Sequence, residues 1–217
     1  MILRRWPLFS LLAAVLVAVS AGRATAAAAG NPEDAQILLR QVSTDMLDEV
    51  KAQAEQADEA RLRAIVERLL IPHVDFRRVS QLVLAKHWRT ASDAQRAQFT
   101  GEFRNFVVRF YTAALANWLQ SNDVPDEPVT FGGVRVRPGS KIIEIPSKLR
   151  RPDGSDVDIG YRMYWEGGRW QVIDVAVAGI SMVTSYRSSF SSQIQQLGVD
   201  GLIARLAQKN VEFATAP

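Results

Sequence analysis

The spacing of apolar residues divides the chain into a helical first part, a β-rich middle and a helical end. Between residues 38 and 118, apolar side chains recur every three or four positions, as on the buried stripe of an amphipathic helix. Between residues 129 and 177 they recur at every second position, the period of a strand with one buried face. After Gly179 the spacing returns to three or four. This order predicts an α+β fold in which helices cover one face of a sheet.

Local signals set the ends of four helices before the sheet. Pro32 stands at the first position of the first helix, where a missing N–H is tolerated, and Pro72 ends the second helix. A third helix is predicted over residues 75–88. The fourth begins at a capping box, in which Ser92 and Gln95 each satisfy a backbone donor of the other.

The fourth helix carries a dense row of aromatic side chains. At about 100° per residue, its phenylalanines lie within about 60° of one another and form one ridge. Further apolar residues up to position 118 widen this face beyond the needs of a surface helix. Such a helix is either central to the core or lines an apolar space. The ridge residues are Phe99, Phe103, Phe106 and Phe110.

Four runs of period two follow, separated by turn-forming glycine and proline residues, and these predict a four-stranded antiparallel meander. The third run alternates most regularly and places Ile159, Tyr161, Met163 and Trp165 on the face predicted to be buried. The runs span residues 129–137, 141–149, 156–165 and 170–177.

The last run continues into a helix whose apolar stripe is interrupted by Arg187. Val183 and Phe190 lie on the same stripe, so the guanidinium takes a position where an apolar side chain is expected. We expect it to meet either a carboxylate, such as that of Asp174, or the anionic head of a ligand. Gly198 is predicted to close this helix before a final one.

The first 26 residues have the pattern of a cleaved secretory signal peptide. Arginines precede an apolar run of about a dozen residues, and small residues follow it. A membrane-spanning helix needs roughly 20 apolar residues. One domain is therefore predicted over residues 27–217, with a frayed tail after residue 210.

Removal of this leader changes the charge of the protein. The full chain has a formal net charge of +3, and residues 1–26 contain three arginines and no acid, so the remaining domain is neutral. A neutral domain lacks the clustered positive charge of a nucleic-acid-binding protein, and no nucleic-acid partner is expected. The chain contains no cysteine, which excludes disulfides and thiolate metal sites.

Few residues form a catalytic or metal-binding pattern. His73 and His87 are the only histidines, and they lack metal-ligand spacing, so neither a metal nor a cofactor is expected. Asp174 is predicted to share a strand face with Trp170 and Val172. There it would be either a general base in an apolar cavity or a carboxylate paired with a cation. The surplus of aromatic residues favours a binding protein over an enzyme.

Seven short segments in a fixed order carry a family resemblance. They are residues 74–76, 82–92, 95–96 with the phenylalanines that follow, 170–175, 179–183, 186–190 and 198–202. Together they resemble the signature of the MlaC family, also called the toluene-tolerance family of periplasmic phospholipid-binding proteins. The similarity extends over about residues 31–210.

This resemblance implies an NTF2-like fold, in which a four-stranded antiparallel sheet and several helices enclose a deep apolar cavity. Family members hold phospholipid acyl chains in that cavity and carry the lipid across the periplasm. Their partners are an outer-membrane lipoprotein complex and an inner-membrane transporter of the ABC class with a periplasmic lipid-binding subunit. The transport maintains outer-membrane lipid asymmetry. The chain is thus expected to be a monomeric periplasmic carrier with phospholipid as its cargo.

The lipid-binding residues are predicted from the ridge, the buried face of the third strand and the start of the helix after the last strand. Arg187 is the predicted head-group contact. If the strand side chains alternate in the opposite sense, the predicted strand residues face away from the cavity and are wrong as a set. The predicted lipid-binding residues are Phe103, Phe106, Val107, Phe110, Ile159, Tyr161, Met163, Trp165, Val183 and Tyr186.

Two other functions fit the same sequence. One is an enzyme on an NTF2-like scaffold with Asp174 as its general base. The other is a lipid-free periplasmic adaptor, which would have a dense core and a large exposed apolar patch.

Overall fold

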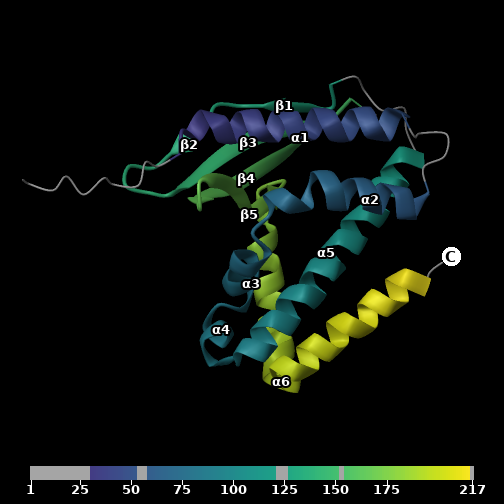
Figure 1. Ribbon diagram of the computed structural model, residues 1–217, viewed down its shortest axis with the longest axis vertical. Coiled ribbons are helices and arrows are strands. Elements are labelled where there is room, and N and C mark those ends of the chain that lie inside the picture. The colour runs from purple at the N-terminus through teal and green to yellow at the C-terminus, as the bar shows by residue number, and fades with distance from the viewer. Residues whose placement is uncertain (1–29, 53–57, 121–126, 152–153, 216–217) are drawn as a thin grey trace, which may run out of the picture.

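The computed structural model describes residues 30–52, 58–120, 127–151 and 154–215. The predicted signal peptide, residues 1–26, lies outside the described residues. Helices form both ends of the described chain and the sheet lies between them in sequence (Figure 1). The helices are α1 (Pro32–Ala52), α2 (Glu59–Leu69), the 3-10 helix η2 (Ile71–His73), α3 (Phe76–Leu84), α4 (Lys86–Thr90), α5 (Asp93–Gln120) and α6 (Met182–Thr215).

An antiparallel sheet of six strands confirms the predicted α+β class but not the predicted number of four strands. The strand order is β1-β3-β4-β5-β6, and β2 also pairs with β3. The predicted first strand is divided at Gly132 and Gly133, and its two halves pair separately with β3. The strands are β1 (Val129–Phe131), β2 (Arg135–Val136), β3 (Ile142–Arg150), β4 (Asp156–Glu166), β5 (Arg169–Val177) and β6 (Ile180–Ser181).

A β-bulge in β5 changes which face Asp174 occupies. Met163 of β4 lies opposite Val172, whereas its neighbour Arg162 lies opposite Asp174, so Ile173 is an extra residue between two regular pairs. One extra residue moves the following side chain to the other face of the sheet. Asp174 therefore does not share the face of Val172, and that part of the sequence prediction is wrong.

Two helix boundaries differ from those expected, and a third is confirmed. The helix predicted over residues 75–88 is broken at Ala85, whose φ of 48° is not helical, and it becomes α3 and α4. The predicted break at Gly198 is confirmed, because this residue has φ 72° and ψ 177° inside α6. Figure 1 shows α6 turning at its lower end. The helix then continues to Thr215, beyond residue 210 where a frayed tail is predicted.

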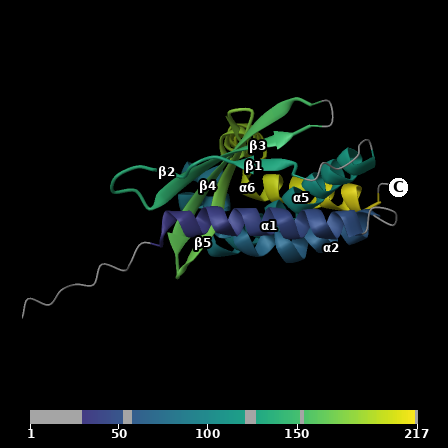
Figure 2. The ribbon, with the colours of Figure 1, turned by 90° about the horizontal axis from the view of Figure 1, so that it is seen from above.

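The core is divided between two groups of helices. α1 packs on the sheet, where its buried Ala35 and Leu39 contact buried residues of β3, β4 and β5. The indole N–H of Trp170 also donates to the backbone carbonyl of Asn31, 2.9 Å away. α3, α4, α5 and α6 pack on one another around Phe99 and Phe103. α1 and α2 lie side by side in both views (Figure 2), and α2 also packs against α5.

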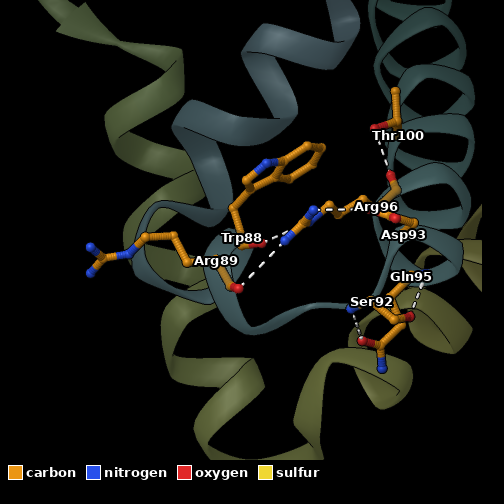
Figure 3. Close-up of polar contacts among 7 residues, drawn as sticks. All are labelled: Trp88, Arg89, Ser92, Asp93, Gln95, Arg96 and Thr100. Carbon is orange, nitrogen blue, oxygen red and sulfur yellow. Dashed lines mark hydrogen bonds and ion pairs between the residues drawn. The ribbon is translucent and has the colours of Figure 1, made fainter.

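The junction between α4 and α5 is fixed by the predicted capping box and by Arg96 (Figure 3). The backbone N–H of Ser92 donates to Gln95 Oε1 at 2.9 Å, and the N–H of Gln95 donates to Ser92 Oγ at 3.1 Å. Arg96 donates from Nε to the carbonyl of Trp88 at 2.9 Å and from Nη2 to that of Arg89 at 3.4 Å. It also pairs with Asp93 at 2.9 Å. One guanidinium thus holds the end of α4 against the start of α5.

Replacing Arg96 by alanine is expected to lower the free energy of unfolding by about 1.5–3 kcal/mol, because two carbonyls lose a charged donor. Urea denaturation followed by circular dichroism measures the change. The control is Arg89→Ala, whose side chain is exposed and points away from this junction (Figure 3). Equal destabilisation by the two substitutions would contradict the proposed role of Arg96.

Candidate functional site

A row of aromatic side chains runs between α5 and α6. Phe103 contacts Tyr186 with ring centroids 5.2 Å apart, and Phe106 contacts the same tyrosine at 6.0 Å. Phe110 stacks on Phe106 at 6.1 Å and meets Tyr111 edge-on at 5.3 Å. These distances are those of favourable aromatic pairs. The helical spacing of the α5 phenylalanines produces the row, and α6 supplies the rings that face it.

Exposure is much greater at the outer end of this row than at its inner end. Phe103 at the inner end is 1% exposed, whereas Phe110 and Tyr111 at the outer end are 44% and 36% exposed. Phe106 lies between them in sequence and is half-buried. A large aromatic surface left in water is unfavourable unless another apolar surface covers it. The row therefore leaves an apolar surface at its outer end that continues directly into the core.

A hydrogen bond between two tyrosines closes the outer part of the row. Its partners are the hydroxyl groups of Tyr111 and Tyr186. Burial, the proximity of Tyr111 and this hydrogen bond all raise the pKa of Tyr186, and burial also raises that of Tyr111 although the hydrogen bond opposes it. Both hydroxyls are thus neutral at physiological pH, so this surface carries no phenolate charge.

The structure gathers the predicted residues of the helices but not those of the sheet. Phe103, Phe106, Val107, Val183 and Tyr186 belong to the cluster formed by α3, α4, α5 and α6. The predicted lipid-binding residues of this cluster are therefore close neighbours, and Phe110 extends them toward solvent through its contact with Phe106.

The predicted residues of β4 lie in a different cluster. Met163 is fully buried, and with Tyr161 and Trp165 it packs in the cluster formed by α1 and the sheet. Ile159 instead lines a groove of about 640 Å³ on the sheet, beside Gly160. The alternation of β4 is confirmed, with Met163 buried and Arg162 exposed. The strand residues nevertheless do not join the aromatic row, because α1 occupies their side of the sheet.

Asp174 has a structural position and not that of a general base. Its carboxylate is 4% exposed and accepts hydrogen bonds from the Ser181 hydroxyl at 2.6 Å and the Val183 N–H at 3.1 Å. It also lies 3.6 Å from Nη1 of Arg162. Both oxygens are therefore engaged at the start of α6, which argues against the enzyme hypothesis. The expected pairing of Asp174 with Arg187 is wrong.

Arg187 bonds to the backbone and not to a carboxylate. Its Nε donates to the carbonyl of Leu82 at 2.8 Å, near the C-terminal end of α3. A cation is favoured at the end of a helix, where carbonyl groups lack intrahelical donors. This contact explains how a cation fits on the stripe of α6. Its predicted role as a head-group contact stays a prediction.

Sequence reasoning left two aromatic residues out of the predicted site. Tyr111 follows Phe110 and completes the outer end of the row, and Phe190 contacts Phe99, Phe103 and Tyr186 at its inner end. The sequence did contain a signal for Phe190, because it lies four residues after Tyr186 and so on the same side of the helix. For Tyr111 the signal was its place on the widened apolar face of the same helix, four residues after Val107.

Neither a metal site nor a membrane span was found in the described ranges. No group of three or more histidine, aspartate or glutamate side chains there is arranged to hold a metal ion. No helix among the described residues combines the length and the apolar character needed to cross a bilayer.

The chain is thus an α+β domain with a partly exposed aromatic row between α5 and α6. The chain belongs to the MlaC family, since the sequence model of that family, described as MlaC protein, matches residues 40–208. This result confirms the family resemblance noted from the sequence.

Two relatives support the same assignment. The intermembrane phospholipid transport system binding protein MlaC of Haemophilus influenzae is 25% identical over 211 residues, which cover 95% of this chain and 93% of that protein. The toluene tolerance protein ttg2D of Pseudomonas putida is 26% identical over 189 residues, covering 86% and 83% of the two chains.

A comparison with solved structures shows the same fold. One such structure is the phospholipid-binding protein of Ralstonia solanacearum in complex with a phospholipid, which superposes with a TM-score of 0.72. The superposition covers 83% of this chain and 99% of that chain, and the sequence identity is 24%.

Removing the Asp174 carboxylate is expected to destabilise the protein. Asp174→Ala should lower the free energy of unfolding by about 2–4 kcal/mol, because the start of α6 loses its acceptor and Arg162 loses its partner. Asp174→Asn should cost less, because its amide oxygen can still accept one hydrogen bond. Urea denaturation measures both, with Asp158→Ala at an exposed position of the sheet as the control. An unchanged unfolding midpoint for Asp174→Ala would contradict the structural role.

Tyrosine ionisation in the folded protein should occur at higher pH than in the unfolded chain. Burial raises the pKa of Tyr111, Tyr161 and Tyr186, whereas unfolded tyrosine has a pKa of about 10. Because the folded pKa values are raised, the protonated tyrosines contribute to the free energy of unfolding below a pH of about 10. This contribution is lost as the pH rises further. Ultraviolet absorbance of tyrosinate, recorded against pH with and without urea, tests this order. Coincident titrations would exclude it.

Proposed function

We propose that this protein is a periplasmic phospholipid carrier that moves lipid between the outer and inner membranes and so maintains outer-membrane lipid asymmetry. Membership of the MlaC family supports this function. So do two similar proteins, of which one is named for intermembrane phospholipid transport and the other for phospholipid binding.

The observation that carries the proposal is the rise in exposure along the aromatic row. Its inner end belongs to the core, and its outer end leaves Phe110 and Tyr111 in water. An acyl chain that covers this surface gains about 0.8 kcal/mol for each buried methylene. A diacyl lipid cannot cross water unaided at a useful rate, and an apolar surface that shields its chains removes that barrier.

The helix residues form the lipid contact in this proposal. Half-buried Phe106, Val107 and Tyr186, together with exposed Phe110, meet the acyl chains, and fully buried Phe103 supports them from behind. The head group stays at the wet end of the row. Met163 and its neighbours on β4 hold α1 on the sheet and act as structural residues.

Transport by this protein involves no covalent chemistry. The carrier binds and releases lipid, and it only equilibrates lipid between two membranes unless its partners bind its loaded and empty forms differently. The proposed partners are an outer-membrane lipoprotein complex and the periplasmic lipid-binding subunit of an inner-membrane ABC-type transporter. The leader of residues 1–26 directs the chain to the periplasm, where it acts as a monomer.

Introducing a charge at the outer end of the row should release the lipid without unfolding the protein. Phe110→Asp is expected to reduce the co-purified phospholipid at least about fivefold, because a carboxylate cannot be buried against acyl chains without a partner. Native mass spectrometry of the protein purified from cells measures the bound lipid, and urea denaturation measures stability.

Two control variants give this test its meaning. Ile37→Asp changes an exposed apolar residue on α1, outside the row, and should leave lipid binding unchanged. Met163→Asp places a charge in the core beneath α1 and should unfold the protein. Absence of phospholipid from the unmodified protein under gentle purification would refute the carrier function and favour the lipid-free adaptor.

A further inference from the structure

The segment that forms α3 and α4 is strongly basic, although the mature domain as a whole is neutral. Residues 76–92 contain Arg77, Arg78, Lys86 and Arg89 and no acidic residue. The preceding stretch, residues 31–75, contains ten acidic and five basic residues. Positive and negative charge are thus separated between neighbouring parts of the chain, an arrangement that orients a protein in the field of a charged partner.

The basic side chains lie on the outer side of α3 and α4. Arg77 and Gln81 are four residues apart and both exposed, so they share the solvent face of α3. Lys86 and Arg89 are exposed on α4, three residues apart. Figure 3 shows the Arg89 side chain directed away from the Arg96 cluster, and Figure 1 shows α3 and α4 together at one side of the molecule.

A cavity of about 550 Å³ lies at one end of this face, between α3 and the turn that joins β4 to β5. Arg77, Gln81 and Arg169 line it, together with the acids Asp75 and Glu166. Both acids are already paired with Arg78, at 3.5 Å and 2.8 Å. Three arginines and two acids therefore line the cavity, which leaves it with a formal net charge of +1.

Several arginines elsewhere in the described chain are paired with acids. Arg63, Arg68, Arg96, Arg104, Arg150 and Arg162 each have an acidic partner within 4.0 Å. Among the residues that the structure describes, Arg77, Lys86, Arg89 and Arg169 have none. We call these four residues and Gln81 the basic face.

We propose that the basic face docks an acidic surface of a protein partner in lipid transport, and this inference rests on the proposed carrier function. Arginine recognises carboxylates with two parallel hydrogen bonds, and three of the four cations here are arginines. The cavity between Arg77 and Arg169 admits a protruding acidic side chain. Complementary charge of this kind speeds encounter and fixes orientation.

A protein surface suits the basic face better than a membrane surface does. A bilayer is flat and cannot enter the cavity, and membrane-surface binding is strengthened by apolar side chains that insert between lipids. The exposed large hydrophobic residues of the described chain include none on α3, α4 or the β4–β5 turn.

The basic face also lies next to the aromatic row without using its residues. α3 and α4 contribute Val83, Leu84 and Trp88 to the cluster that contains Phe103. Arg187, which follows Tyr186 of the row, bonds to the carbonyl of Leu82 in α3. The basic face is thus joined to the inner end of the row through the packing of α3 and α4.

The test uses the protein purified with its bound lipid and, as the probe, the purified periplasmic lipid-binding subunit of the inner-membrane transporter. Arg77→Glu combined with Arg89→Glu should weaken binding at least about tenfold, and the corresponding double glutamine variant should have an intermediate effect. Binding by the unmodified protein should weaken as salt is added. The matched control is Arg205→Glu with Lys209→Glu, which makes the same charge change at exposed positions of α6 and should alter affinity less than about twofold.

The outcomes separate this inference from the carrier function. Native mass spectrometry should show that all these variants retain as much lipid as the unmodified protein. If the unmodified protein itself holds no lipid, the carrier function is refuted but the docking face is not. Equal effects of the two charge reversals, or no binding by the unmodified protein, would overturn the inference. Binding of the unmodified protein to phosphatidylglycerol vesicles that is lost on reversal of Arg77 and Arg89 would assign the face to membranes and overturn it also.

Discussion

The carboxylate of Asp174 is the contact on which the arrangement of the helices depends. It joins the last long strand to α6 by accepting hydrogen bonds from Ser181 and Val183 while it pairs with Arg162 on the neighbouring strand. The bulge at Ile173 turns this carboxylate to the face where α6 begins. Because the start of α6 is fixed there, Tyr186 and Phe190 meet the phenylalanines of α5, and the aromatic row is a consequence of this corner.

The division of the core explains how one small domain can be stable and still leave an apolar surface available. α1 covers the buried face of the sheet, so Met163 and its neighbours are buried without a ligand. The helical cluster closes around Phe99 and Phe103 but leaves Phe110 and Tyr111 partly in water. Binding of an apolar ligand therefore changes the surroundings of the outer aromatic residues and leaves the packing of the sheet intact.

The proposed lipid-binding surface and the proposed docking surface differ in their chemistry. The aromatic row is neutral, since the hydroxyls of Tyr111 and Tyr186 are protonated and bonded to each other. The basic face on α3 and α4 carries charge and no large exposed apolar side chain among the described residues. A carrier built in this way can exchange partners through screened, reversible electrostatic contacts while its cargo stays bound by the hydrophobic effect.

The sequence by itself determined the class of fold, the family, the capping box at Ser92, the break at Gly198 and the phenylalanine ridge, because each depends on residues close in sequence or on a periodicity. It could not determine the face of Asp174, since one extra residue in β5 reverses every later side chain and leaves no sign in the local pattern. Nor could it show that α1 covers Met163 or that Arg187 bonds to Leu82. Those contacts join segments far apart in the chain, and only tertiary packing decides which surfaces meet.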